Sequence, residues 1–139
     1  MEKKEAYELM LLQLKGLLEA ESNWLANLAN SSALLNETLP DTVFAGYYLF
    51  QEGELILGPF QGRVSCTRIQ LGKGVCGESA AEKKTMIVDN VKEHENYISC
   101  DSAAMSEIVV PMLDNDQLIG VLDIDSCLLY TSDAADEGL

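Results

Sequence analysis

The stretch Glu107–Ser126 (EIVVPMLDNDQLIGVLDIDS) carries the strongest indication of how the chain folds. Two apolar segments, Glu107–Leu113 and Leu118–Ile124, are separated by the polar tripeptide Asp114-Asn115-Asp116. Asp and Asn at the centre of a short connection tolerate the left-handed backbone that tight hairpin turns require. The stretch therefore predicts two antiparallel strands that form the last hairpin of a sheet.

Four segments on the N-terminal side of this hairpin are also predicted to be strands, because β-branched, aromatic and apolar residues dominate them. They are Thr42–Phe50, Glu54–Leu57, Val64–Leu71 and Thr85–Val88. Glu52-Gly53 predicts a turn between the first two. A short helix is expected at about Val75–Glu82, and Lys92–Ser102 is expected to be a loop.

The N-terminal third predicts two helices. Residues 4–20 form an amphipathic pattern in which apolar residues recur at helical spacing, namely Tyr7, Met10, Leu11, Leu14, Leu17 and Leu18. The second helix is expected from about Ser22 to Leu35, with Trp24, Leu25 and Leu28 on its apolar side. Together with the strands, this order predicts a single α+β domain with a mostly antiparallel central sheet and the N-terminal helices packed on it.

The composition excludes several classes of function. The 139 residues are enough for one domain, and 9 Lys and Arg stand against 23 Asp and Glu, for a net charge of −14. Such a chain is unsuited to nucleic acid or to an anionic membrane surface, since both are bound by neutralising phosphates. The acidity suits a ligand with an ammonium group, although solubility alone is the simpler explanation. With no signal peptide and no apolar run of about 20 residues, we expect a cytoplasmic protein.

Three cysteines, Cys66, Cys76 and Cys100, lie in or beside the predicted strands. In a reducing compartment, such thiols are more often redox-active or metal-binding than structural cross-links. Their C-x9-C-x23-C spacing lacks the closely spaced cysteine pair of most zinc sites, and the chain has one histidine, His94. We expect no metal, and His94, between two glutamates, is expected to be a solvated loop residue. A thiol-based reductase is predicted, with buried, inert cysteines as the alternative.

The segment Gly72–Gly77 (GKGVCG) matches the G-x-G-x-x-G pattern of dinucleotide-binding folds. The expected helix after it has room for only about two turns, and the chain is too short for the paired βαβαβ halves that hold a dinucleotide. The glycines therefore predict a tight strand-to-helix turn that uses their conformational freedom.

Asp123 and Asp125 alternate with Ile124 at the end of the last predicted strand, so both carboxylates face one side of the sheet. Paired carboxylates repel each other and usually need a cation, a ligand or a shared proton. A solvated strand end is the alternative. Glu107, which opens the neighbouring strand, favours a binding site, because it can bring a third carboxylate to the same place.

These residues, taken together, resemble the free methionine-(R)-sulfoxide reductases, small single-domain enzymes with a GAF fold. The resemblance runs from about Val43 to Ser126 and rests on three specific segments, Gly58–Gly77, Ser99–Pro111 and Ile119–Ser126. It implies the reduction of free L-methionine (R)-S-oxide to L-methionine by thiols, without a cofactor.

The resemblance also implies roles for individual residues. Cys100 is the nucleophile that becomes a sulfenic acid, Cys66 resolves it as a disulfide that thioredoxin reduces, and Cys76 has an auxiliary role. Glu107, Asp123 and Asp125 line the substrate pocket and hold the α-ammonium group.

Two aromatic residues are assigned to the same pocket by this resemblance. Tyr48 packs against the substrate. Phe44 occupies a position where the family has a Trp, so the apolar wall remains and the indole hydrogen bond is lost. A homodimer is left open.

The C-terminal end departs from the family. The segment Cys127–Glu137 has no periodicity and looks like a translated sequencing-adapter read-through, so residues 1–126 are expected to be the domain and 127–139 a non-native tail. A genuine disordered acidic tail is the alternative. The closing C-terminal helix of a GAF fold is accordingly expected to be missing, which exposes apolar surface.

Two other functions remain compatible with the sequence. One is a GAF-type module that senses a small molecule or redox state without catalysis, and the other is a partner-binding domain with incidental thiols.

Overall fold

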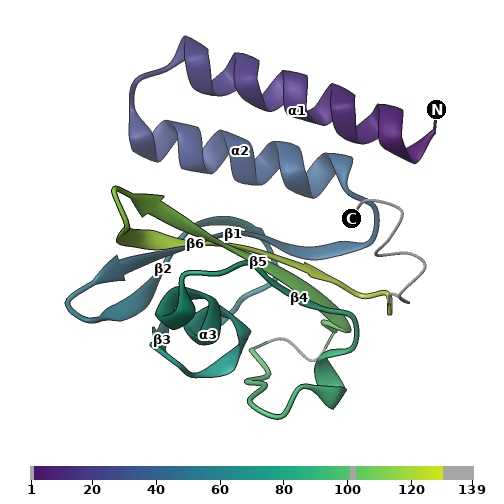
Figure 1. The fold of residues 1–139 in the computed structure, drawn as a ribbon. Helices are drawn as coiled ribbons and strands as arrows, with labels where there is room; N and C mark the ends of the chain where they lie inside the picture. The colour runs from purple at the N-terminus through teal and green to yellow at the C-terminus, as the bar shows by residue number, and fades with distance from the viewer. Residues whose placement is uncertain (1, 101–102, 130–139) are drawn as a thin grey trace.

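The computed structural model describes residues 2–100 and 103–129 and consists of three layers (Figure 1). Two long helices lie on one face of a curled sheet, and a short helix lies on the other face (Figure 1). The elements in chain order are α1 (Lys3–Ala20), α2 (Trp24–Thr38), β1 (Thr42–Gln51), β2 (Glu54–Gly62), β3 (Arg68–Gln70), α3 (Gly74–Glu82), β4 (Met86–Val88), the 3-10 helix η1 (Val91–Glu93), β5 (Ser106–Asp114) and β6 (Gln117–Ser126).

The sheet has six strands in the order β3-β2-β1-β6-β5-β4, and every neighbouring pair is antiparallel. β5 and β6 form the predicted hairpin, in which Asn115 and Asp116 adopt positive φ angles of 49° and 65°. Two successive residues with positive φ characterise the tight hairpin turn that matches the twist of the strands. The predicted α+β class and the antiparallel sheet are confirmed.

The sheet separates two apolar cores, because successive side chains of a strand point to opposite faces. Phe44 and Tyr48 of β1 pack on the α3 side, with Leu55, Val109 and Val121 among their buried neighbours. On the other side, the main buried members are Met10, Leu35 and Ala45.

The predicted apolar side of α2 is wrong. Trp24 and Leu25 are 60% and 52% exposed, and the buried face comprises Ser31, Ser32, Leu34 and Leu35. The serines face the sheet because their hydroxyls bond to it. Ser31 Oγ lies 2.7 Å from the Tyr47 hydroxyl, and Ser32 Oγ donates to the Pro59 carbonyl at 3.2 Å. Small side chains with hydrogen-bond partners on the sheet therefore decide which face of this helix is buried.

Strand β3 is shorter than the predicted strand Val64–Leu71, and Val64 is 89% exposed. The chain leaves the sheet before Arg68 because Cys66 is held elsewhere, by a disulfide to Cys100 and by the Tyr48 hydroxyl, which donates to the Cys66 carbonyl at 2.9 Å. Strand β2, in contrast, runs on to Gly62, and a shift in register between Gly46 and Tyr48 keeps it paired with β1.

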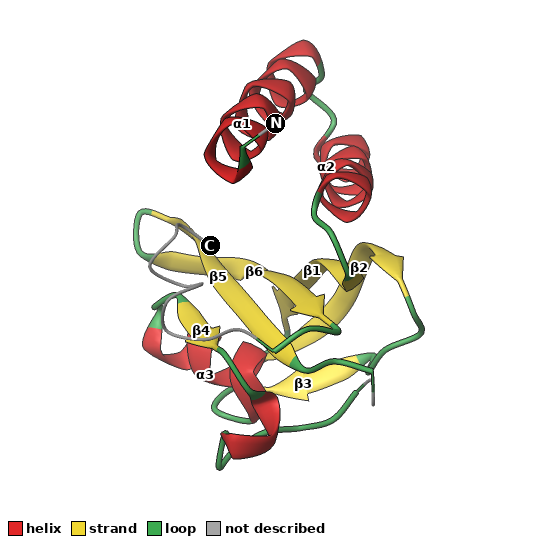
Figure 2. Cartoon of the chain, turned by 90° about the vertical axis from the view of Figure 1, so that its right-hand side faces the viewer, coloured by secondary structure: helices red, strands yellow, loops and turns green. Residues whose placement is uncertain are grey.

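Helix α1 packs on α2 and stands away from the sheet (Figure 2). A largely apolar cavity of about 310 Å³ lies between α1 and the β4–β6 side of the sheet, with Tyr7, Met10, Ile87, Ile108 and Ile124 among its lining residues. That a closing C-terminal helix is missing from this face of the sheet stays a prediction. No helix in the described part of the chain is both long and apolar enough to cross a membrane.

The predicted tail begins close to the domain. Cys127 N–H donates to the Asp41 carbonyl at 3.0 Å, and the Ser106 hydroxyl donates to the Leu128 carbonyl at 2.7 Å. Residues 130–139 lie outside the described residues, so the non-native tail and the domain boundary at residue 126 stay predictions.

The predicted glycine turn between β3 and α3 is confirmed. Gly72 and Gly74 have φ angles of +83° and +65°, which other residues rarely adopt. Gly77 serves a different purpose, because a Cβ atom there would lie 2.5 Å from the Gln70 carbonyl oxygen. The turn thus holds α3 against the end of β3, and through α3 it sets the position of Cys76.

The contact at Gly77 gives a stability prediction. Gly77→Ala must displace backbone, so we expect the free energy of unfolding to fall by about 1–3 kcal/mol in urea titrations followed by circular dichroism. Gly16→Ala is the matched control, since a Cβ at this position in α1 has nothing within 4 Å. It should be neutral or stabilising by up to about 1 kcal/mol. Equal effects of the two substitutions would refute the close-contact argument.

Candidate functional site

Three carboxylates meet on the face of the sheet that α3 covers. Asp123 and Asp125 of β6 point to this face, as their two-residue spacing predicts, and Glu107 of β5 pairs directly with Asp125 across the strands. Asp123 is 4% exposed and Asp125 is also buried. The structure therefore brings together the three acids that the sequence analysis selected.

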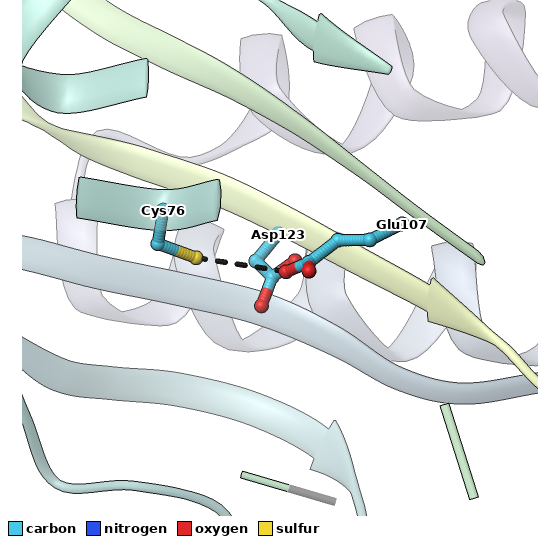
Figure 3. Close-up of side chains that lie close together, drawn as sticks. All are labelled: Cys76, Glu107 and Asp123. Carbon is cyan, nitrogen blue, oxygen red and sulfur yellow. Dashed lines mark hydrogen bonds between the residues drawn. The ribbon is translucent and has the colours of Figure 1, made fainter. Parts of the chain in front are cut away.

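Cys76 joins this group from the first turn of α3 (Figure 3). Its thiol points at the carboxylates and donates a weak hydrogen bond to Glu107 Oε2 at 3.8 Å. One ligand atom each from Cys76, Glu107 and Asp123 lies within 4.8 Å of the other two. Nothing in the C-x9-C-x23-C spacing indicates this contact, because it depends on how α3 crosses the sheet.

Burial and mutual repulsion oppose ionisation in this cluster. Burial, followed by the nearby Asp125 and Glu107, raises the pKa of Asp123 well above its usual range. Burial also raises the pKa of the Cys76 thiol, and Asp123 and Glu107 add to the effect. Asp123 Oδ1 is buried without a hydrogen-bond partner. Such an atom is uncommon in folded proteins and marks a place where a ligand can bind.

Cys66 and Cys100 form a disulfide, with their Cα atoms 5.2 Å apart. They come from two irregular segments, one before β3 and the other before β5. The Tyr48 hydroxyl, which also lies 3.0 Å from Ser65 Oγ, holds the first of these segments.

The segment that leads to Cys100 is fixed to α3 by side chains. Both carboxylate oxygens of Glu78 lie 3.0 Å from His94 Nε2, and the Asn96 amide donates to Glu78 Oε1 and to the Gly72 carbonyl at 2.7 Å. The expectation that His94 is a solvated loop residue is wrong, because its side chain is only 21% exposed and is paired with Glu78.

A small cavity of about 20 Å³ lies between the disulfide and the carboxylates. Its wall includes predicted site residues from five elements or segments, namely Tyr48, Cys76, Cys100, Glu107, Asp123 and Asp125. This volume suffices for about one water molecule, since roughly 10–15 Å³ is needed for each. In the disulfide-bonded form the site therefore holds little free space.

Two predicted residues lie outside the wall. Cys66 is bonded to Cys100, and Phe44 packs behind Tyr48 with ring centroids 6.1 Å apart. Seven further residues line the cavity and were not among the predicted site residues: Ser65, Ile69, Lys73, Gly74, Val75, Tyr97 and Ile98. Tyr97 was identifiable as a lone aromatic in a polar loop three residues before Cys100. Burial raises its pKa to about 12, so its hydroxyl remains protonated at neutral pH.

The geometry allows two kinds of chemistry. Cys66 and Cys100 can interconvert between dithiol and disulfide, and the adjacent acidic group can bind a cation. Among the described residues, Cys76, Glu107 and Asp123 form a group with the spacing to hold a metal ion.

Comparisons with known proteins identify relatives along the whole chain. The GAF domain family matches residues 11–137. Free methionine-R-sulfoxide reductase of Escherichia coli K12 is 43% identical over 140 residues, which cover 100% of this chain and 85% of that protein. The reductase of the same name from Saccharomyces cerevisiae is 46% identical over 136 residues, covering 92% of this chain and 75% of the yeast protein.

This chain is also similar to a solved structure. The structure of free methionine-R-sulfoxide reductase from Neisseria meningitidis in complex with its substrate superposes with a TM-score of 0.91 at 41% identity. The superposition covers 98% of this chain and 82% of that chain. The expected GAF fold is thereby confirmed.

The raised pKa of Asp123 gives a prediction about stability and pH. The folded protein keeps a proton on Asp123 that the unfolded chain releases above about pH 3.9, so this residue makes the free energy of unfolding fall as pH rises. Asp123→Asn cannot ionise. We expect the variant to be more stable than the parent at pH 7, by about 1.4 kcal/mol for each unit of pKa elevation, and the difference to shrink towards pH 4.

Urea unfolding of both proteins between pH 4 and 7.5 measures this difference. This pH range lies below the one in which ionisation of the Cys76 thiol affects stability. Asp114→Asn, at an exposed position at the end of β5, is the control and should show no such trend. An Asp123→Asn variant that is less stable than the parent at pH 7, with no change towards pH 4, contradicts the argument.

Proposed function

The chain belongs to the free methionine-R-sulfoxide reductases of the GAF domain family, and from this premise we propose that it reduces free L-methionine (R)-S-oxide to L-methionine. One observation carries the proposal. Cys100, bonded to Cys66, lines the same cavity as the buried acids Asp123 and Asp125 and the neighbouring Glu107. A redox-active sulfur and a binding site for a positive charge thus lie beside each other.

The acids select the substrate in this proposal. Mutual repulsion opposes the simultaneous ionisation of Glu107, Asp123 and Asp125, so an α-ammonium group among them relieves that repulsion and is bound where charge screening by water is weak. Peptide-bound methionine sulfoxide lacks that ammonium group and is excluded. Tyr48 lines the same cavity and packs against the substrate, and Phe44 supports Tyr48 from behind.

The reaction transfers the sulfoxide oxygen to the enzyme. The Cys100 thiolate attacks the sulfoxide sulfur while one of the acids protonates the oxygen. The hydroxyl group then moves to the Cys100 sulfur as the bond between the two sulfurs breaks, and methionine leaves as the two-electron-reduced product. Asp123 suits the role of proton donor, because burial and the nearby Asp125 and Glu107 raise its pKa well above the usual range. Cys100 is left as a sulfenic acid, with its sulfur oxidised by two electrons.

Cys66 completes the cycle. Its thiol attacks the sulfenic sulfur of Cys100, water leaves, and the disulfide forms. A thioredoxin dithiol then reduces that disulfide and becomes a disulfide itself. Cys76 is an auxiliary thiol in this scheme, since it is buried and its raised pKa disfavours the reactive thiolate.

The size of the cavity suggests the order in which disulfide reduction and substrate binding occur. A cavity of about 20 Å³ holds roughly one water molecule, whereas methionine sulfoxide has ten non-hydrogen atoms. The free space in the disulfide-bonded form is therefore too small for the substrate, and in this proposal reduction of the Cys66–Cys100 bond comes before binding. The cycle needs a thiol reductant at every turn, which fits the reducing cytoplasm as the place where the enzyme works.

The decisive experiment incubates the folded protein with racemic free methionine sulfoxide and dithiothreitol. We expect methionine to form until about half of the substrate is consumed, with the S epimer left over and N-acetylmethionine sulfoxide unreacted. Chiral amino-acid analysis measures both quantities. No methionine from a folded protein would favour the sensing module. Equal consumption of the two epimers contradicts the proposed selectivity for the R epimer.

Two cysteine variants serve as matched controls for this assay. Cys100→Ser should abolish turnover, because it removes the atom that accepts the oxygen. Cys127→Ser changes an exposed thiol outside the cavity and should retain the parent rate.

The resolving role of Cys66 gives a separate prediction. With thioredoxin, thioredoxin reductase and NADPH, Cys66→Ser should release about one methionine per enzyme and then stop, since its Cys100 sulfenic acid has no partner. Rapid-quench quantification of methionine measures the burst, and a dimedone adduct detected by mass spectrometry locates the sulfenic acid. Full steady-state turnover in this variant assigns resolution to another thiol.

A further inference from the structure

We propose that Cys76, Glu107 and Asp123 form a binding site for a thiophilic divalent cation of the zinc class. The proposal goes beyond the reductase function, because it requires neither Cys66 nor Cys100. The three ligands come from α3, β5 and β6, and their side chains converge on one point (Figure 3).

The distances between the ligand atoms fit a small tetrahedral site. The Cys76 Sγ and Glu107 Oε2 atoms are 3.8 Å apart, and all three ligand atoms lie within 4.8 Å of one another. Zinc–sulfur and zinc–oxygen bonds of about 2.3 and 2.1 Å at a tetrahedral angle place sulfur and oxygen about 3.6 Å apart. Small side-chain movements therefore suffice to bind the ion.

A second and independent observation points to a ligand at this place. Asp123 is 4% exposed, and its Oδ1 atom has no hydrogen-bond partner. Buried oxygens are nearly always bonded, and a bound cation supplies the missing partner. The cation also offsets the repulsion among Asp123, Glu107 and the adjacent Asp125.

The thiol determines the class of ion. Magnesium and calcium prefer six or more oxygen ligands, whereas zinc and cobalt accept a thiolate together with carboxylates. Three protein ligands leave the fourth position of such a site to a water molecule, and the adjoining cavity of about 20 Å³ has room for one.

Cysteine spacing and the single histidine, from which no metal was expected, carry no information about a set of one cysteine and two carboxylates that lie far apart in the chain. If the proposed reductase function holds, the ion occupies the same acids as the substrate ammonium group and inhibits the enzyme.

The test uses the disulfide-bonded protein with Cys127→Ser, in which Cys76 is the one remaining thiol. Cobalt(II) is added, and the near-ultraviolet band of a thiolate–cobalt bond is followed to its end point, after which zinc is added to displace it. We expect one cobalt per chain and displacement by zinc but not by magnesium. No band from the folded protein overturns the proposal. This readout does not depend on activity. The metal site can therefore be confirmed even if the reductase function is refuted, and refuted even if the reductase function is confirmed.

Three variants in the same background assign the ligands, each checked for folding by circular dichroism. Cys76→Ser should remove the band. Glu107→Gln should keep the band and weaken zinc binding at least tenfold, a loss that even outer-shell changes can cause. Glu95→Gln removes the same charge from an exposed position and should leave the affinity unchanged.

A band that survives in Cys76→Ser places the cobalt elsewhere and overturns the proposal. Equal zinc affinities of Glu107→Gln and Glu95→Gln also overturn the proposal. This comparison tests the metal site even if Cys76→Ser does not fold.

Discussion

The register of the strands β1, β6 and β5 is the constraint on which the rest of the molecule depends. Side chains alternate along β6, so Asp123 and Asp125 face α3 while Ile124 faces the long helices. A slip of one residue would exchange the two sets of side chains. The carboxylates would then be buried under the long helices, and Ile124 would occupy the small cavity between the sheet and α3. The folding of the sheet and the assembly of the site are thus one event, because the same register produces both.

The sequence was sufficient for the elements whose signals are local. The β5–β6 hairpin, the glycine turn before α3 and the antiparallel sheet follow from alternation and turn residues. The buried face of α2 does not, since it depends on hydrogen bonds that Ser31 and Ser32 make with Tyr47 and with the Pro59 carbonyl, residues far away in the sequence. The early end of β3 likewise depends on Cys66, whose bond to Cys100 is not a local property.

The residues of the site also fall into those that local sequence predicts and those that it does not. The pairing of Glu107 with Asp125 was predictable, because it depends on two neighbouring strands of one hairpin. Lys73 and Tyr97 were missed because they reach the cavity from a turn and a loop, for which periodicity carries no information. The contact between Cys76 and the acids requires the position of α3 across the sheet, which only the three-dimensional structure supplies.

The cross-link between Cys66 and Cys100 also ties stability to redox state. It closes a loop with a sequence separation of 34, which includes β3, α3 and β4. A loop of this length lowers the entropy of the unfolded chain enough to stabilise the fold by about 3–4 kcal/mol. In the proposed cycle, the form that awaits substrate is the uncrosslinked one. The protein is then most resistant to heat and proteases when oxidised, and most vulnerable when ready to work.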